Sequence, residues 1–271
     1  MGGKPDDTLT LGGDLEVRRL GFGAMRAESN VALLRRVVEL GINLIDTADA
    51  YDSGDNEQLV AEALHPYPDG LVIATKAGHR RPNGDWTVDG RPEWIREACE
   101  NSLRRLKLER IDLYQLHRPD PEVPVAETLG AFKELQDEGK VGHIGVSNFS
   151  LELLREAQEV VDVVSVQNEY NLGDRRSEDV LQACEADGIG FIPWYPLATG
   201  DLARPGGPLD EVAKAHEATP GQVALAWLLH HSPVMLPIPG TSSAEHLEEN
   251  VAATRLELAD GELERIEAAA G

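Results

Sequence analysis

The sequence predicts an α/β fold: a closed (β/α)8 TIM barrel with an N-terminal β-hairpin and an extra C-terminal helix. Two observations carry this prediction. Eight short apolar segments recur along the 271 residues, each followed by an amphipathic helical segment, and no linker or low-complexity stretch divides the series. Regular alternation of strand and helix is typical of a parallel sheet covered by helices, and eight such units close the sheet into a barrel. We therefore expect residues 1–271 to form a single domain.

The strand candidates are short apolar runs, many of them rich in β-branched residues. They cover residues 20–25, 43–48, 71–76, 111–117, 143–148, 163–168, 190–194 and 234–238. The helices expected between them show the 3.6-residue apolar period, as Val31, Leu34 and Val38 illustrate. They cover residues 29–40, 56–65, 92–106, 125–138, 150–160, 177–187, 209–230 and 243–253, and residues 260–270 form the extra helix.

The expected helix boundaries carry local signals. The N-cap candidates are Ser29, Asn56, Ser150 and Thr219, the last followed by Pro220. Glycines at 41, 139 and 188 fall where helices should end. The alternating run 9–20, centred on Gly12 and Gly13, predicts a hairpin that covers the N-terminal face of the barrel. The longest loops are expected at 77–91 and 198–208.

An open doubly wound sheet is the alternative architecture. It is less favoured because no G-x-G-x-x-G motif follows the first predicted strand.

The chain is strongly acidic. Asp and Glu number 48 against 25 Lys and Arg, of which six are lysines, and the formal net charge is −23. Such a surface repels nucleic acid and anionic membranes, so neither is an expected partner. An ordinary acidic cytosolic protein is one interpretation. The scarcity of lysine favours another, a halophilic protein whose self-repulsion is relieved by salt.

Several other classes of protein are disfavoured. No run of 18 apolar residues predicts a membrane span, and no basic, apolar N-terminal segment predicts secretion, so we expect a cytoplasmic protein. Cys99 and Cys184 lie far apart in helical segments and are expected to be reduced core residues. No Cys/His cluster has the spacing of metal ligands, so we expect no metal site.

Polar residues stand at the carboxyl end of several predicted strands. In a barrel these ends meet at one face, where chemistry is found. Reading along the chain, they are Asp46, Asp49 and Tyr51, then Lys76, His117, Ser147, Asn148, Gln167 and Asn168.

This set suits the reduction of a carbonyl group, provided that something supplies hydride. An ammonium paired with a carboxylate beside a phenol should lower the phenol pKa from about 10 towards neutrality and make Tyr51 a general acid. His117 would orient the carbonyl oxygen. Taken singly, each of these residues has a structural explanation or another role; Lys76, for example, would suit a Schiff-base lyase.

Six motifs make the chain resemble the aldo-keto reductase family, as a short prokaryotic-type member. They are NLIDTADAY, IATK, LYQLHRPD, GHIGVSNFS, VQNEYN and LPIPGTSS, and the likeness covers nearly the whole chain. The resemblance implies a catalytic tetrad of Asp46, Tyr51, Lys76 and His117, with Tyr51 as the proton donor. It also implies a nicotinamide cofactor, bound in extended form without a Rossmann fold.

The resemblance further implies which residues bind the cofactor. Ser147, Asn148 and Gln167 match positions that hold the carboxamide, and Trp194 replaces the usual tyrosine that stacks on the nicotinamide. The remaining cofactor contacts implied are Gly23, Ala24, Leu197, Thr199, Gly200, Gly240, Thr241, Ser242, His246, Glu249 and Asn250. Because Gly240 and His246 stand where many members have a lysine and an arginine for the 2′-phosphate, NADP(H) is expected with NAD(H) as an alternative.

The substrate is expected to be a small carbonyl compound. Met25, Trp86 and Arg118 are the substrate-binding candidates, and Arg118 stands where the family often has an aromatic residue, which would favour substrates with a carboxylate or phosphate. A monomer or weak oligomer is expected. The alternative function, also suggested by the family, is a non-catalytic regulatory subunit that binds nicotinamide cofactor.

Overall fold

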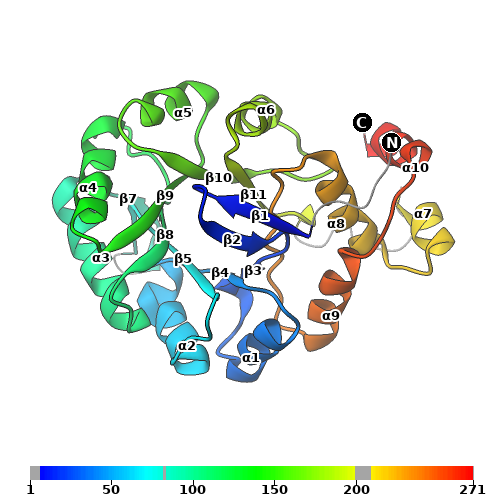
Figure 1. Ribbon diagram of the computed structural model, residues 1–271, viewed down its shortest axis with the longest axis horizontal. Coiled ribbons are helices and arrows are strands. Elements are labelled where there is room, and N and C mark those ends of the chain that lie inside the picture. Colours follow the sequence, from blue (N-terminus) through cyan, green and yellow to red (C-terminus); the bar gives the residue numbers. More distant parts are fainter. Residues whose placement is uncertain (1–6, 82–83, 199–208, 271) are drawn as a thin grey trace.

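The computed structural model describes residues 7–81, 84–198 and 209–270. Its centre is a curled, fully parallel sheet whose seven strands run in the order β11-β10-β9-β8-β5-β4-β3 (Figure 1). The strands are β3 (Phe22–Gly23), β4 (Leu44–Asp46), β5 (Val72–Ala77), β8 (Ile111–Leu116), β9 (Val141–Ser147), β10 (Val163–Glu169) and β11 (Gly190–Trp194). All seven lie within or overlap predicted strands.

The eighth predicted strand, 234–238, closes the barrel without forming a regular ladder. On one side it makes two backbone hydrogen bonds with Phe191 of β11, both 2.8 Å long. On the other side, the Gly21 amide next to β3 donates to the carbonyl of Pro237 at 3.0 Å. Pro237 and Pro239 have no N–H to donate, which explains why pairing is interrupted here. The predicted (β/α)8 barrel is therefore confirmed.

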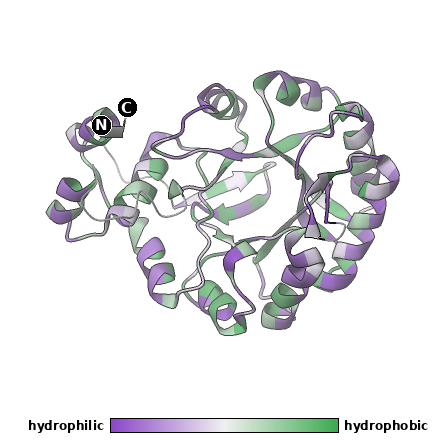
Figure 2. Ribbon diagram, turned by 180° about the vertical axis from the view of Figure 1, so that it is seen from behind, coloured by the Kyte–Doolittle hydropathy of each residue, from purple (hydrophilic) through white to green (hydrophobic). Residues whose placement is uncertain are grey.

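Helices surround the sheet (Figure 1). Eight of them follow strands in the manner of a barrel: α1 (Val31–Glu39), α2 (Asp55–Leu64), α3 (Pro92–Leu106), α4 (Val125–Asp137), α5 (Leu151–Gln158), α6 (Glu178–Asp187), α8 (Pro220–His231) and α9 (Ala244–Ala253). Two more are α7 (Asp210–Ala215) and the extra helix α10 (Asp260–Ala270), and two 3-10 turns are η1 (Ala24–Arg26) and η2 (Tyr51–Gly54). Hydrophilic and hydrophobic residues alternate along the outer helices in Figure 2, as expected when one helix face packs on the sheet.

The structure differs from three of the predictions about helix boundaries and caps. The segment 209–230 forms two helices, because Thr219 and Gln222 make a complete capping box that starts α8 afresh. Asn30, not Ser29, caps α1, accepting a hydrogen bond from the Leu33 amide.

Asn56 is not a cap either. It lies inside α2, where its side chain donates to the Ala24 carbonyl at 2.8 Å and accepts from the Thr47 hydroxyl at 2.7 Å. Ser150 and Thr219 are N-caps, as predicted.

The predicted hairpin covers the N-terminal end of the barrel, and Figure 1 shows it lying across the centre of the ring. It consists of β1 (Thr8–Leu11) and β2 (Leu15–Arg18). Leu11 and Val17 are fully buried against the inward-facing residues that begin the strands, such as Leu44. The fit is close: a Cβ on Gly190 would lie 2.3 Å from the Leu11 side chain.

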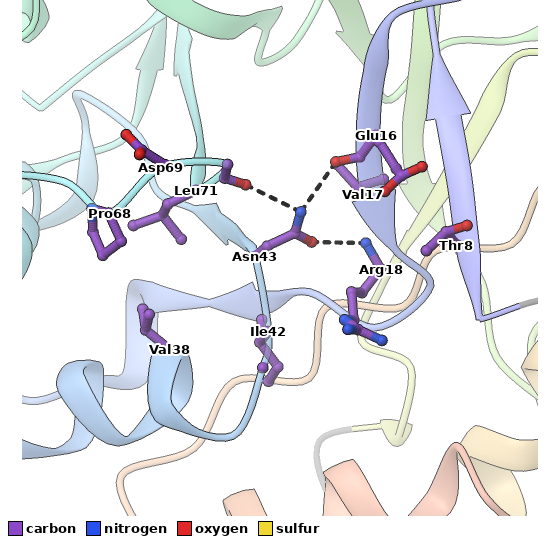
Figure 3. Close-up of a pocket in the computed structure, with 12 residues that line it drawn as sticks. Thr8, Glu16, Val17, Arg18, Val38, Ile42, Asn43, Pro68, Asp69 and Leu71 are labelled. Atoms are coloured by element: carbon purple, nitrogen blue, oxygen red, sulfur yellow. Dashed lines mark hydrogen bonds between the residues drawn. The ribbon is translucent and has the colours of Figure 1, made fainter.

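Asn43 ties the hairpin to the barrel wall (Figure 3). Its amide nitrogen donates to the carbonyls of Glu16 and Gly70, at 3.0 and 3.2 Å, and its oxygen accepts from the Arg18 amide at 2.7 Å. The hollow of about 340 Å³ beside it lies at the N-terminal end of the barrel, opposite the polar strand ends.

The loop at 77–91 carries a short antiparallel ribbon of β6 (His79–Arg80) and β7 (Thr87–Val88). None of the helices in the described part of the chain is long and apolar enough to span a membrane.

Candidate active site

A buried ion pair lies at the carboxyl end of the strands. Lys76 of β5 places its Nζ 2.7 Å from Oδ2 of Asp46, the last residue of β4, and the two side chains are 0% and 3% exposed. Burying two charges is costly unless all their polar atoms are satisfied. Four further hydrogen bonds satisfy them here.

Two side-chain amides donate hydrogen bonds to the other oxygen of the Asp46 carboxylate. Gln115 of β8 and Gln167 of β10 each donate from Nε2 to the Asp46 Oδ1, at 3.1 and 2.9 Å. The structure therefore joins the Gln167 amide to the charged pair. Gln115 was not predicted as a site residue. Its signal in the sequence is a polar residue inside an apolar strand, two positions before His117 and so on the same strand face.

The Lys76 ammonium makes its two remaining hydrogen bonds with the Thr47 carbonyl and with Tyr51. Lys76 Nζ donates to the carbonyl at 2.8 Å and to the Tyr51 hydroxyl oxygen at 3.3 Å. All three N–H donors of the ammonium are thus used by acceptors of the protein. Burial opposes the charge, but Asp46 and Tyr51 together raise the pKa of Lys76 above its usual value. The lysine is therefore a fixed cation, which is unfavourable for a Schiff-base nucleophile.

Tyr51 stands at the start of η2 with the ammonium 5.0 Å from its ring centroid. Burial raises the pKa of its phenol, and the opposing effect of Lys76 does not cancel that rise. The expectation that the ammonium brings this pKa towards neutrality is therefore wrong for the free protein. The phenol keeps its proton at neutral pH. Because its oxygen accepts from Lys76, that proton can be donated to another acceptor.

His117 lies immediately after β8, with its ring centroid 5.7 Å from that of Tyr51 and the planes at 84°. Burial, reinforced by Lys76 and His79, lowers its pKa well below the usual 6.5. Its Nδ1 is buried and has no hydrogen-bond partner among the described residues. A neutral imidazole therefore stands beside the phenol.

The ribbon after β5 lies next to these rings. The ring centroid of Trp86 lies 6.4 Å from that of Tyr51 and 6.1 Å from that of His117. His79 packs edge to face on His117, with 4.5 Å between the ring centroids. His79 donates from Nδ1 to the Thr87 carbonyl at 3.1 Å, which fixes the ribbon. His79 was not singled out in the sequence, because nothing local to it shows that the loop folds back over the strand ends.

Ser147 and Asn148 lie together at the end of β9. Asn148 donates from Nδ2 to the His117 carbonyl and the Ser147 hydroxyl, both at 3.0 Å, and accepts from Arg118 at 3.3 Å. Asn148 adopts a left-handed conformation, with φ of 62°. The Asn148 side-chain amide thus links Ser147, a predicted carboxamide-binding residue, to His117 and to Arg118, a predicted substrate-binding residue.

Trp194 ends β11, and its indole Nε1 is buried without a partner among the described residues. Its ring packs against Tyr195, with centroids 4.8 Å apart and planes at 75°. The neighbouring Leu197 is half-buried. Two predicted cofactor contacts, Thr199 and Gly200, lie outside the described residues.

The predicted binding positions after 234–238 lie between β3 and the start of α9. Gly23 and Gly240 approach closely, since a Cβ on Gly240 would lie 2.6 Å from the Gly23 carbonyl oxygen. Ser243 caps α9 by accepting from the His246 amide, and the Thr241 hydroxyl accepts from the Ser243 amide. The other predicted residues differ in exposure: Ser242 and His246 are exposed, Glu249 is half-buried, and Ala24 and Asn250 are buried.

In the described part of the chain, no three His, Cys, Asp or Glu side chains are grouped as metal ligands. What the strand ends do bring together is a phenol, a fixed ammonium, a carboxylate and a neutral imidazole. These groups can hold and transfer a proton at a polarised carbonyl oxygen.

Comparison with known proteins shows the family to which the chain belongs. Residues 10–270 match the model of the Aldo/keto reductase family. The chain is 48% identical to an uncharacterised oxidoreductase of Schizosaccharomyces pombe, over 91% of this chain and 84% of that one. It is 39% identical to pyridoxine 4-dehydrogenase of Escherichia coli, over 94% and 95% of the two chains. The chain therefore belongs to the aldo-keto reductase family, a family of oxidoreductases.

A solved structure shows the same fold. The aldo-keto reductase of Klebsiella pneumoniae in complex with NADPH superposes with a TM-score of 0.84 at 30% identity, covering 97% of this chain and 94% of that one.

Proposed function

We propose that the protein is an NAD(P)H-dependent reductase of aldehydes and ketones, with Tyr51 as the proton donor. One observation carries the proposal: Lys76 donates to the Tyr51 oxygen at 3.3 Å, so the phenol proton is free for a substrate oxygen. The aldo-keto reductase fold and the NADPH complex of the Klebsiella relative support the choice of cofactor.

The residues present fit a nicotinamide cofactor. Trp194 offers an indole at the strand ends whose Nε1 has no partner in the described chain. The capped N-terminus of α9, with Thr241 and Ser242 before it, provides amide and hydroxyl donors of the kind that hold a phosphate. When bound, the cofactor supplies the hydride.

The protein's own residues would act on the oxygen of the carbonyl. Tyr51 donates its proton as negative charge develops there, and Lys76 stabilises the phenolate that remains, since its charge is fixed by Asp46. His117, a neutral imidazole beside the phenol ring, orients the carbonyl oxygen. The buried ion pair therefore tunes and positions the phenol rather than reacting itself.

The test is the rate of cofactor oxidation with a panel of aldehydes, for the native protein and for Tyr51→Phe. Loss of one proton donor should lower kcat by roughly 10²–10⁴ while cofactor binding, followed by fluorescence, is retained. Tyr67→Phe is the matched control, because Tyr67 donates to the Leu106 carbonyl away from the strand ends. Full activity in Tyr51→Phe would refute the role of the phenol.

The same measurements separate the alternatives. Cofactor binding without turnover of any carbonyl in the native protein would favour a regulatory cofactor-binding subunit. NADPH and NADH are compared directly, because His246 and Gly240 leave the 2′-phosphate preference open. Pyridoxine belongs in the oxidation panel, since a relative 39% identical carries that activity in its name.

A further inference from the structure

Three large apolar side chains stand exposed on the described part of the chain, and all three lie at one end of the barrel. Met25, Trp86 and Tyr195 are 53%, 44% and 45% exposed. Each follows the carboxyl end of a strand: Met25 follows β3, Trp86 lies in the loop after β5, and Tyr195 follows β11. Exposed apolar groups gathered in one region mark a binding surface.

The two aromatic residues come from opposite sides of the barrel mouth. Counting from β3, β5 is the third strand and β11 the seventh, so their following loops lie on opposite sides of an eight-stranded ring. Trp86 is the one placed next to the phenol: its ring centroid lies 6.4 Å from that of Tyr51, with the planes at 72°. A flat ring bound beside Tyr51 would therefore have the Trp86 indole next to it.

Tyr195 is held in this position against a conformational cost. Its φ is 56°, a left-handed backbone that a bulky residue rarely adopts. Its carbonyl accepts from the Asn171 side chain at 3.1 Å and from the Ala198 amide at 2.9 Å, which fixes the strained turn. Strain of this kind gathers at binding sites.

Arg118 adds a cation to the same mouth. It is exposed and follows the fourth strand, β8. Its contact is the Asn148 amide oxygen at 3.3 Å, and no carboxylate of the described chain lies within ion-pair distance of it. By contrast, Arg80 and Arg91 nearby are both paired with Asp89. In a chain of net charge −23, an arginine beside the site without an acidic partner is suited to an anionic ligand.

We propose that the substrate of this site is an aromatic aldehyde or ketone that carries an anionic substituent, its ring against Trp86 and its anion on Arg118. This inference rests on the proposed reductase function and adds the class of substrate to it. In the reaction the carbonyl gains a hydride from the reduced cofactor and a proton from Tyr51, and the anionic group takes no part.

The experiment measures kcat/KM with NADPH for three aldehydes: 4-carboxybenzaldehyde, benzaldehyde and hexanal. The native protein should prefer the carboxylated ring to benzaldehyde, and benzaldehyde to hexanal. Arg118→Gln should reduce the first preference by roughly ten- to a hundredfold, the range of a charge-assisted contact. Trp86→Leu should reduce the second preference. Arg104→Gln is the matched control, because it removes one exposed arginine on α3 and should leave both preferences as they are.

The outcomes separate this inference from the function on which it rests. If the native protein reduces all three aldehydes equally well, or if Arg118→Gln and Arg104→Gln behave alike, the substrate class is wrong and the reductase function stands. If no carbonyl compound in the panel is reduced with either cofactor, the proposed function itself fails.

Discussion

Lys76 and Asp46 form a buried ion pair at the base of the barrel mouth, with 2.7 Å between Nζ and Oδ2. Every donor of the ammonium and both oxygens of the carboxylate are used, because Thr47, Tyr51, Gln115 and Gln167 surround the pair. The pair thereby joins strands β4, β5, β8 and β10 to the phenol. Its removal should affect both stability and chemistry.

The first prediction concerns the contribution of this ion pair to the stability of the fold. Lys76→Met leaves a buried carboxylate without its cation, and Asp46→Asn leaves a buried ammonium without its anion, so each should cost about 3–5 kcal/mol of unfolding free energy. The double variant Asp46→Asn/Lys76→Met should lose less unfolding free energy than the two single variants lose together. Urea unfolding measures all three.

Lys133→Met is the control for this cycle, since Lys133 pairs with Asp137 on the exposed face of α4. That change should cost less than about 1 kcal/mol. Strict additivity of the two buried substitutions would contradict coupling between Lys76 and Asp46.

The pH dependence of reduction follows from two pKa shifts of opposite direction. Burial raises the pKa of Tyr51 above 10 and lowers that of His117 well below 6.5. Between these values the phenol keeps its proton and the imidazole is neutral. We expect kcat/KM to stay level across the range from about pH 6.5 to 10, and to fall only well below the lower value and above the upper one. A profile at constant ionic strength measures this, and an acid limb near pH 7 that disappears in His117→Gln would count against it.

The sequence predicted the strands better than the electrostatics of the site. Strands such as 71–76 and 190–194 are visible because strands buried on both faces are mostly apolar. Polar residues at the ends of strands, including Lys76 and His117, were visible because they interrupt or follow such apolar runs. The net shift in the pKa of Tyr51 could not be predicted from the sequence, because it is a balance between burial and a nearby charge that only the packed structure sets. Gln115 was missed because its partner, Asp46, lies 69 residues away.

Asp49 is predicted to destabilise the fold at neutral pH. Its Oδ1 is buried without a partner among the described residues, and burial, together with Glu57, raises its pKa well above the usual value. A raised folded-state pKa means that the ionised form costs stability above that pKa and that the cost vanishes below the unfolded value of about 4. Asp49→Asn should therefore raise stability at pH 8 by about 1 kcal/mol or more and have little effect near pH 4.

Thermal unfolding at the two pH values measures this effect. Asp52→Asn, at an exposed carboxyl three residues away, should change stability little at either pH. Equal effects of Asp49→Asn at pH 4 and pH 8 would show that the substitution does not act through the buried charge.

The hairpin is predicted to contribute to stability and not to catalysis. Leu11 is fully buried in the cluster that fills the N-terminal end of the barrel, opposite the phenol. Leu11→Ala should cost about 2–5 kcal/mol through lost burial and the cavity that remains. Below its unfolding temperature the variant should keep its kcat. Thr10→Ala, at the exposed neighbouring position of β1, is the control and should change stability by less than about 0.5 kcal/mol. A loss of kcat in folded Leu11→Ala would show that the hairpin also shapes the mouth.

The acidic surface leads to a prediction about salt. Acidic residues number 48 against 25 basic ones, an excess of 23 negative charges, so self-repulsion should dominate the surface at low ionic strength. At about 1 M salt the screening length falls to roughly 3 Å, which relieves repulsion. It also weakens exposed pairs such as Arg36 with Glu248, but each of these is worth about 1 kcal/mol at most. We therefore expect Tm to rise from low salt to 2 M KCl.

The affinity for an anionic cofactor should likewise hold or improve over that range, because the repulsion it meets is screened as well. Circular dichroism melts and cofactor fluorescence titrations at matched KCl concentrations measure both quantities. A variant with exposed Glu62, Glu156 and Glu257 changed to Gln should melt higher at low salt and respond less to KCl, since part of the repulsion has been removed. If Tm does not change with KCl, or if cofactor affinity falls steeply as KCl rises, charge repulsion does not limit this protein, and adaptation to high salt is not the reason for its composition.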